Sequence, residues 1–154
     1  GVDPSLKTFN GISRMAENLG KGKELNLYCQ CAEQVIPNGM FDLVFTSPPY
    51  FDTEKYSNEP TQSYKKYPTY EKWFDGFLTK MIDNSLGILK SNGYLIINIA
   101  NVKSAPTLEN DFKALMEMHN TPLIKTYKME LSKQHSGGKF KFEPIFVYKK
   151  ETFI

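Results

Sequence analysis

The chain has 154 residues, of which 40% are hydrophobic and 14% aromatic, and its formal net charge is +2. A chain of this length folds as one domain with a substantial core, so residues 1–154 are expected to form a single domain. The sequence holds no apolar run of membrane-spanning length and no signal peptide, which excludes an integral membrane protein and predicts a cytoplasmic one. The net charge is too small to indicate a nucleic-acid partner by itself.

Two cysteines, Cys29 and Cys31, stand two positions apart in an alternating apolar pattern. Zinc sites combine two pairs of ligands, whereas the sequence offers no second cysteine pair and only two histidines, His119 and His135. We therefore expect no bound metal, and two reduced, partly buried thiols.

The first predicted helix follows Asp3 and Pro4, which suit an N-cap and the first helical position. Apolar residues then recur at helical spacing until Gly20 or Gly22 ends the helix. The apolar positions of this helix are Leu6, Phe9, Ile12, Met15, Ala16 and Leu19. The next segment, Glu24–Gln30, alternates apolar and polar residues and predicts a strand.

A short apolar run, Phe41–Thr46, predicts a buried strand, and Ser47-Pro48-Pro49-Tyr50 follows it directly. Each proline fixes its own φ and lacks an N–H, so the strand must stop in a rigid turn. In an open α/β sheet, ligands bind in the crevice outside the carboxyl ends of the strands. The turn is expected to present the Ser47 hydroxyl, the proline carbonyls and the flat Tyr50 ring to that crevice.

These groups suit chemistry on an exocyclic amine. Such an amine is planar and a poor nucleophile, because its lone pair is conjugated with the ring or carbonyl it is attached to. Acceptors aimed at its N–H groups pull the nitrogen towards a tetrahedral, nucleophilic geometry, and a stacked ring holds the planar substrate in line with an electrophile. The alternative interpretation is a Pro-Pro turn that only closes a strand.

A polar, aromatic segment at residues 51–69 follows this turn and is longer than most connections. Lysines interleave with aromatic rings there, and a second basic, Gly-rich turn is predicted at residues 132–139. Rings can stack on bases and lysines can meet phosphates. The candidate nucleic-acid contacts are Tyr64, Lys65, Lys66, Lys139 and Lys141. The alternative is an ordinary solvated loop.

Thr69 is the candidate N-cap of a long amphipathic helix that reaches Leu89. Asn92-Gly93 is predicted to turn the chain into a strand buried on both faces, Tyr94–Ala100. Asn98 lies near the carboxyl end of that strand and is interpreted as a strand-end cap, with substrate contact as the alternative. Three elements complete the predicted order: a helix at Leu108–His119 and the strands of a final hairpin at Leu123–Leu131 and Phe140–Lys149.

The predicted strand and the Thr46-Ser47-Pro48-Pro49-Tyr50-Phe51 run that ends it resemble the catalytic motif of the S-adenosylmethionine-dependent amino methyltransferases. These enzymes act on cytosine N4, adenine N6 or, in relatives, an amide nitrogen. Serine in the first position of the motif is most similar to the cytosine-N4 branch, and Glu143-Pro144-Ile145 resembles the family's late motif. The resemblance covers nearly the whole chain. It implies a catalytic set of Ser47, Pro48, Pro49 and Tyr50, and S-adenosylmethionine as the cofactor.

The resemblance also implies which residues hold the cofactor. In the family, an acidic residue that closes the second strand binds the ribose hydroxyls, and Asp3 matches it. The third strand often ends in an acidic and then a small residue near the adenine. Ala32 matches the small position, whereas Cys31 stands in the acidic one and leaves Glu33 as the substitute. Thr46, directly before the catalytic turn, completes the implied set.

The family's glycine-rich cofactor turn has no counterpart, because Leu19-Gly20-Lys21-Gly22 follows a predicted helix and no strand. The sequence therefore predicts an α/β fold: a Rossmann-like methyltransferase sheet, mostly parallel with an antiparallel final hairpin, without its first strand and without a separate target-recognition domain. The neighbours of the missing strand would expose unpaired edges, which predicts self-association or a segment upstream of Gly1.

The expected function is methyl transfer to an exocyclic amino nitrogen of a DNA base, cytosine N4 favoured, as in DNA modification and restriction–modification. A base inside a duplex has to be flipped out for this reaction. The alternatives within the enzyme class are an adenine-N6, an RNA or a protein-amide methyltransferase. The alternative outside it is a catalytically silent domain or fragment that binds nucleic acid or a partner subunit.

Overall fold

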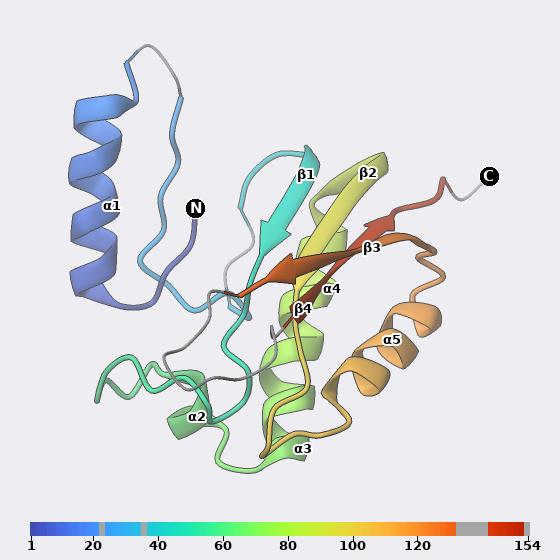
Figure 1. Cartoon of the computed structure of the whole chain (residues 1–154). Helices are drawn as coiled ribbons and strands as arrows, with labels where there is room; N and C mark the ends of the chain where they lie inside the picture. The colour runs from blue at the N-terminus through green and yellow to red at the C-terminus, as the bar shows by residue number, and fades with distance from the viewer. Residues whose placement is uncertain (22–23, 35–36, 132–141, 153–154) are drawn as a thin grey trace. The chain divides into compact units, whose positions relative to one another are not determined.

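The computed structural model describes residues 1–21, 24–34, 37–131 and 142–152 (Figure 1). The chain divides into two compact units. The first unit comprises residues 1–37 and 54–84, and the second comprises residues 38–53 and 85–154. The predicted catalytic turn therefore belongs to the second unit, whereas Asp3, Ala32 and Glu33 belong to the first.

The first unit begins with helix α1 (Leu6–Leu19), whose N-cap residue is Ser5. Asp3, predicted as the N-cap, lies two residues earlier, and its Oδ1 accepts a hydrogen bond from the Ser5 N–H at 2.8 Å. The carboxylate thus orders the turn that leads into the helix. No residue of α1 is buried, and the side chains of Leu6, Met15 and Leu19 are 58%, 61% and 76% exposed. The apolar residues of the predicted helix face are therefore present but largely exposed to solvent.

The strand predicted at Glu24–Gln30 is wrong. Within the described residues 24–34, extended pairing is reduced to one parallel bridge between Val2 and Tyr28. The Tyr28 N–H donates to the Gly1 carbonyl and the Tyr28 carbonyl accepts from the Asp3 N–H. An alternating sequence becomes a strand only when a neighbour of similar length pairs with it, and here the pairing segment spans only the first three residues.

The remaining helices of the first unit follow the catalytic turn in sequence. They are α2 (Ser63–Lys66), α3 (Tyr70–Trp73), the π-helix η1 (Phe74–Thr79) and α4 (Lys80–Gly87), which runs across the boundary into the second unit. Thr69 caps α3 as predicted, because its Oγ1 accepts from the Lys72 N–H. The predicted single helix is interrupted by η1, and π-helical turns are frequent at functional sites.

The second unit contains a four-stranded sheet in the order β1-β2-β4-β3 among the described residues. The strands are β1 (Phe41–Thr46), β2 (Leu89–Asn98), β3 (Leu123–Glu130) and β4 (Phe142–Lys149). β1 and β2 are parallel, and β4 is antiparallel to both β2 and β3. β1, β2 and β3 therefore run in one direction and only β4 reverses, which agrees with the predicted mostly parallel sheet closed by an antiparallel hairpin.

Strand β2 begins earlier than predicted. Asn92-Gly93, predicted as a turn, lies inside the strand at a register shift against β1. Asn92 has φ 64°, in the left-handed region that asparagine tolerates better than most residues. At Gly93 a Cβ would lie 2.9 Å from the Lys90 carbonyl oxygen. The pair therefore forms a bulge that glycine makes sterically possible.

Helix α5 (Leu108–Met118) packs on the sheet through aromatic rings. The ring of Phe112 lies 6.0 Å from that of Phe146 and 5.7 Å from that of Tyr148, both on β4. The core of the second unit also contains fully buried residues on β2, on α5 and between them, namely Leu89, Leu95, Ile97, Ile99, Leu108 and Met116. This packing fixes the position of β2 and β4, whose ends carry the site described next.

Candidate functional site

The register of the sheet brings three chain segments to one end of it. Thr46, the last residue of β1, pairs with Ile97 of β2, and Asn98 of β2 pairs with Ile145 of β4. Because β1 and β2 are parallel and β4 is antiparallel to β2, the carboxyl ends of β1 and β2 meet the amino end of β4. The Ser47–Tyr50 turn, Asn98 and Glu143 therefore belong to one place, all within the second unit.

The hydroxyl groups of the predicted catalytic turn meet at a single amide oxygen. Ser47 Oγ donates to Asn98 Oδ1 at 3.3 Å, and Tyr50 Oη donates to the same oxygen at 2.9 Å. Tyr50 Oη also lies within hydrogen-bond distance of Glu143 Oε2, at 3.2 Å. The structure thus brings Ser47 and Tyr50 together, and it adds Asn98 and Glu143 to them.

The backbone after the prolines turns back on itself. The Pro49 carbonyl accepts from the Phe51 N–H at 3.1 Å, and the Tyr50 carbonyl accepts from the Thr53 N–H at 3.1 Å. Phe51 has φ 51°, which is uncommon for a bulky residue and marks a constrained turn. Ser47 is exposed and Pro48 is buried, whereas Tyr50 is only 6% exposed. The turn therefore presents serine to solvent and keeps the tyrosine ring largely covered.

In the first unit, the predicted cofactor residue Glu33 lies in a buried polar cluster. Its Oε1 is 2.6 Å from Lys66 Nζ and accepts from Tyr67 Oη at 3.3 Å. Its Oε2 is buried and has no hydrogen-bond partner among the described residues. Tyr67 comes this close because Gly76 has no side chain: a Cβ there would lie 2.4 Å from the Tyr67 ring.

The charge of Glu33 affects the groups around it. Burial raises the pKa of the Cys31 thiol, and the Glu33 carboxylate raises it further. Burial and then the same carboxylate raise the pKa of Tyr67. Burial lowers the pKa of Lys66, but the hydrogen bond and the charge of Glu33 outweigh it, so that the pKa is raised. The negative charge of Glu33 disfavours the anionic forms of Cys31 and Tyr67 and favours the cationic form of Lys66, so it raises all three pKa values.

The side chains of the other predicted cofactor residues are half-buried. Asp3 is half-buried, with one carboxylate oxygen bound to the Ser5 N–H. Ala32 is half-buried, and its carbonyl accepts from Asn84 Nδ2 at 3.3 Å. Thr46 is half-buried at the end of β1, in the second unit.

The predicted nucleic-acid residues fall into two groups. Tyr64 Oη donates to the Ser57 carbonyl at 3.1 Å, exposed Lys65 donates to the Asn58 carbonyl, and Lys66 is paired with Glu33. These interactions order the residues around α2. Lys139 and Lys141 lie outside the described residues.

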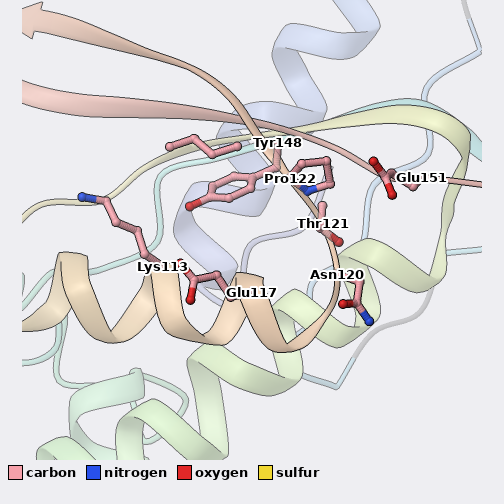
Figure 2. Close-up of a pocket in the computed structure, with 8 residues that line it drawn as sticks. Lys113, Glu117, Asn120, Thr121, Pro122, Tyr148 and Glu151 are labelled. Atoms are coloured by element: carbon pink, nitrogen blue, oxygen red, sulfur yellow. The ribbon is translucent and has the colours of Figure 1, made fainter.

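A hollow lies elsewhere in the second unit, near the end of α5 (Figure 2). Its volume is about 400 Å³, and its lining includes Lys113 and Glu117 of α5, Tyr148 of β4 and Glu151. Tyr148 Oη is buried without a hydrogen-bond partner among the described residues, and burial, followed by the charge of Glu117, raises its pKa to about 12. Tyr148 pairs with Leu95, three residues from Asn98 along β2, and none of the predicted site residues lines this hollow.

Sequence reasoning assigned Asn98 to the end of a strand and missed its contacts with the catalytic turn. The available signal was a carboxamide in an apolar run of the sequence, since Asn98 stands between Leu95-Ile96-Ile97 and Ile99. Over the part of the chain that the structure describes, there is no cluster of metal-ligating side chains and no helix long and apolar enough to cross a membrane.

A protein-family model described as DNA methylase matches residues 41–154, from the first strand of the sheet to the end of the chain. The match includes the Ser47–Tyr50 turn, Asn98 and Glu143. No curated protein sequence matches the chain.

Solved structures of methyltransferases share the fold at low sequence identity. The N-methyltransferase NodS from Bradyrhizobium japonicum WM9 superposes with a TM-score of 0.62 at 10% identity, over 98% of this chain and 72% of NodS. The magnesium protoporphyrin IX methyltransferase ChlM from Synechocystis PCC 6803, solved with bound SAM, gives 0.59 at 16% identity, over 98% of this chain and 58% of ChlM. A methyltransferase from Pyrococcus furiosus gives 0.60 at 13% identity, over 98% and 61%. The chain therefore has a methyltransferase fold and spans only part of these proteins.

Proposed function

Because the chain belongs to the DNA methylase family, we propose that it carries the catalytic part of a methyltransferase that acts on the exocyclic amino nitrogen of a DNA base, with cytosine N4 as the favoured target. S-adenosylmethionine supplies the methyl group, as an electrophilic carbon on sulfonium, when it is bound. The base has to leave the duplex before its amino group can reach the Ser47–Tyr50 turn.

The observation that carries this proposal is the state of the Ser47 hydroxyl. Ser47 is exposed at the carboxyl end of β1, and its hydroxyl donates to Asn98 Oδ1. With its proton directed at Asn98, Ser47 Oγ offers lone pairs to an incoming N–H group. An acceptor fixed in this way favours a pyramidal amine and stabilises the charge that develops on the nitrogen.

Tyr50 supports the same proposal through its ring. Base–aromatic stacking contributes roughly 1–3 kcal/mol per base and suits any planar substrate. Tyr50 is held by Asn98 and Glu143 through its hydroxyl and is 6% exposed. Stacking therefore requires more of the ring to become accessible when the base enters.

The residues of the first unit fit the proposed cofactor in their chemistry. Glu33 Oε2 is a buried carboxylate oxygen without a partner among the described residues, which suits a donor N–H or O–H of a ligand. Asp3 offers a half-buried carboxylate for hydroxyl groups, and half-buried Ala32 offers a small surface for a flat ring. Thr46, next to Ser47, is the proposed contact from the second unit.

DNA contact is proposed for Tyr64, Lys65 and Lys66 in the first unit and for Lys139 and Lys141 in the second. Exposed lysines close to a tyrosine ring suit a strand whose phosphates and bases are both contacted. Of the two lysines of this set that the structure describes, Lys65 is the more suitable, because its side chain is exposed and bound only to a backbone carbonyl.

The test is methyl transfer by the complete protein, measured with labelled S-adenosylmethionine on DNA containing cytosine or adenine targets. Ser47→Ala should lower kcat by about 10- to 100-fold by removing an oriented acceptor, with little change in Tm. Ser91→Ala is the matched control. Ser91 is exposed and lies near the amino end of β2, whereas Ser47 follows the residue of β1 that pairs near the carboxyl end of β2. Equal turnover by both variants would refute the role of Ser47, and transfer only to RNA or protein amides would refute DNA as the substrate.

A further inference from the structure

The side chain of Asn98 is unusual for its place in the fold. It is 6% exposed, whereas Tyr94 and Ile96, which alternate with it onto the same face of β2, are 41% exposed and half-buried. Burying a carboxamide costs free energy unless its donors and acceptor find partners. An apolar residue would fill this position at lower cost, so the polar atoms of Asn98 need an explanation.

The two ends of the Asn98 amide face different partners. Nδ2 donates to the Pro144 carbonyl at 2.9 Å, which holds the nitrogen towards β4. Oδ1 consequently faces the catalytic turn, where it accepts from Tyr50 Oη at 2.9 Å and from Ser47 Oγ at 3.3 Å. The backbone of β4 thus determines which end of the amide meets the two hydroxyl groups.

This orientation determines what the Ser47 hydroxyl can do. A hydroxyl group has one proton and two acceptor sites. While the proton is engaged by Asn98 Oδ1, Ser47 Oγ can only accept from a further group. An amide turned the other way would offer N–H donors to the serine, which would then direct its own proton towards the substrate and repel the N–H groups of an amine.

We propose that Asn98 is a positioning residue: anchored on the Pro144 carbonyl, it directs the Ser47 hydroxyl proton inwards so that Ser47 Oγ accepts from the substrate amine, and it holds the Tyr50 ring through the same oxygen. This inference rests on the proposed function, because it concerns the same turn. Glu143 has a smaller part: it offers Tyr50 Oη a second acceptor at 3.2 Å, while the phenol has one proton to share.

The experiment is a double-mutant cycle in the complete protein between Asn98→Leu and Ser47→Ala, read as kcat and KM for methyl transfer and as Tm. In the wild-type background, Asn98→Leu should lower kcat about tenfold or more, since it leaves both hydroxyl groups without their acceptor. In the Ser47→Ala background, the further loss should be smaller, because only the contact of Asn98 with Tyr50 is then left to lose. Asn98→Asp keeps an acceptor oxygen for the two hydroxyl groups but sets its other oxygen against the Pro144 carbonyl, so it should recover only part of kcat.

One result would overturn the proposal: the same loss of kcat from Asn98→Leu with and without Ser47. If Asn98→Leu does not fold, the cycle is run with Asn98→Asp, whose loss should likewise shrink in the Ser47→Ala background.

A readout without substrate separates this inference from the proposed function. The side-chain amide of Asn98, observed by NMR in asparagine-labelled protein, should exchange slowly with solvent and shift on Ser47→Ala or Tyr50→Phe. A rapidly exchanging, unresponsive amide would refute the positioning geometry. If the amide behaves as expected but the wild-type protein methylates no base, the proposed function fails while the geometry stands.

Discussion

Glu33 and Lys66 form an ion pair in which Lys66 Nζ lies 2.6 Å from Glu33 Oε1 and the Glu33 side chain is 3% exposed. The pair links the segment that follows Tyr28 to helix α2, which are 33 residues apart in sequence. Lys66 itself is 29% exposed, so solvent screens part of its charge. The main effect of the Lys66 charge is to compensate the Glu33 carboxylate, which is largely removed from water.

We expect Lys66→Met to destabilise the protein by about 1–2 kcal/mol, because it leaves the Glu33 carboxylate buried without its cation. Lys65→Met is the matched control, since Lys65 is exposed and its change should stay within about 0.5 kcal/mol. Urea unfolding measures both. The pKa of Lys66 is raised above 10.5, so the contribution of the pair is complete below pH 10.5 and is lost as pH rises through the folded-state pKa. Equal stability of the two variants would contradict the role of the pair.

The hydroxyl and the ring of Tyr50 should contribute separately. Tyr50→Phe keeps the ring and removes the hydrogen bonds to Asn98 and Glu143, so it should lower both Tm and methyl transfer modestly. Tyr50→Ala also removes stacking, worth roughly 1–3 kcal/mol, and should reduce transfer by at least a further tenfold. Because Tyr50 is buried, the alanine variant should also lose stability through a cavity.

The control for these Tyr50 variants is Tyr94→Phe, on an exposed part of β2. Equal transfer rates for the two Tyr50 variants, compared at equal folded fraction, would exclude stacking.

The salt dependence of DNA binding should distinguish the lysines of the nucleic-acid prediction. Lys65→Ala should reduce the slope of log K against log salt by about one, as expected for one lost phosphate contact. Lys66→Ala should change the slope less, because Glu33 already pairs with its ammonium group. Replacing Lys139 and Lys141 together should reduce it by about two. Fluorescence anisotropy across a salt series provides the measurement, with Lys90→Ala as a control because Lys90 is paired with Asp42. A salt-independent affinity would exclude phosphate contact by these lysines.

Tyr148→Phe should leave the protein as stable as the wild type at pH 7, or more stable by about 1 kcal/mol, since it removes a buried hydroxyl that has no partner among the described residues. The pKa of Tyr148 is raised to about 12 from 10, so the unfolded chain loses this proton first and stability falls between pH 10 and 12. The variant should lose less stability than the wild type in that range. Chemical unfolding at pH 7 and pH 11 tests both statements. A loss above 1 kcal/mol at pH 7 would indicate a partner for the hydroxyl.

The isolated 154-residue chain should self-associate through the apolar face of β1. Phe41, Leu43 and Phe45 alternate along one face of the strand and are 39%, 52% and 65% exposed. An exposed apolar edge strand is a template for association. Phe45→Lys should lower the associated fraction in sedimentation velocity, whereas Met118→Lys, which removes another exposed apolar side chain, should not. A monomeric wild-type chain at tens of micromolar would contradict this expectation.

The sequence alone determined those features that depend on residues close to one another along the chain. Phe41–Thr46 is a strand and stops at two prolines, because proline lacks the N–H that would extend the ladder. The prediction that this strand is buried is wrong, since none of its residues is buried. Thr69 caps its helix, and β3 and β4 pair antiparallel, as predicted for the strands of the final hairpin. The resemblance carried by the Ser47–Tyr50 motif also indicated the family, because the motif occupies consecutive positions.

Tertiary structure decided whatever depends on a distant partner. The segment at Glu24–Gln30 has the pattern of a strand but pairs only through Tyr28, because strand formation requires a neighbour that sequence periodicity does not reveal. Asn98 meets Ser47 and Tyr50 across 51 and 48 residues, and Glu33 meets Lys66 across 33. Such contacts follow from the register of the sheet and from packing, and only the folded chain shows that a strand-end asparagine and the catalytic turn share one hydrogen-bond network.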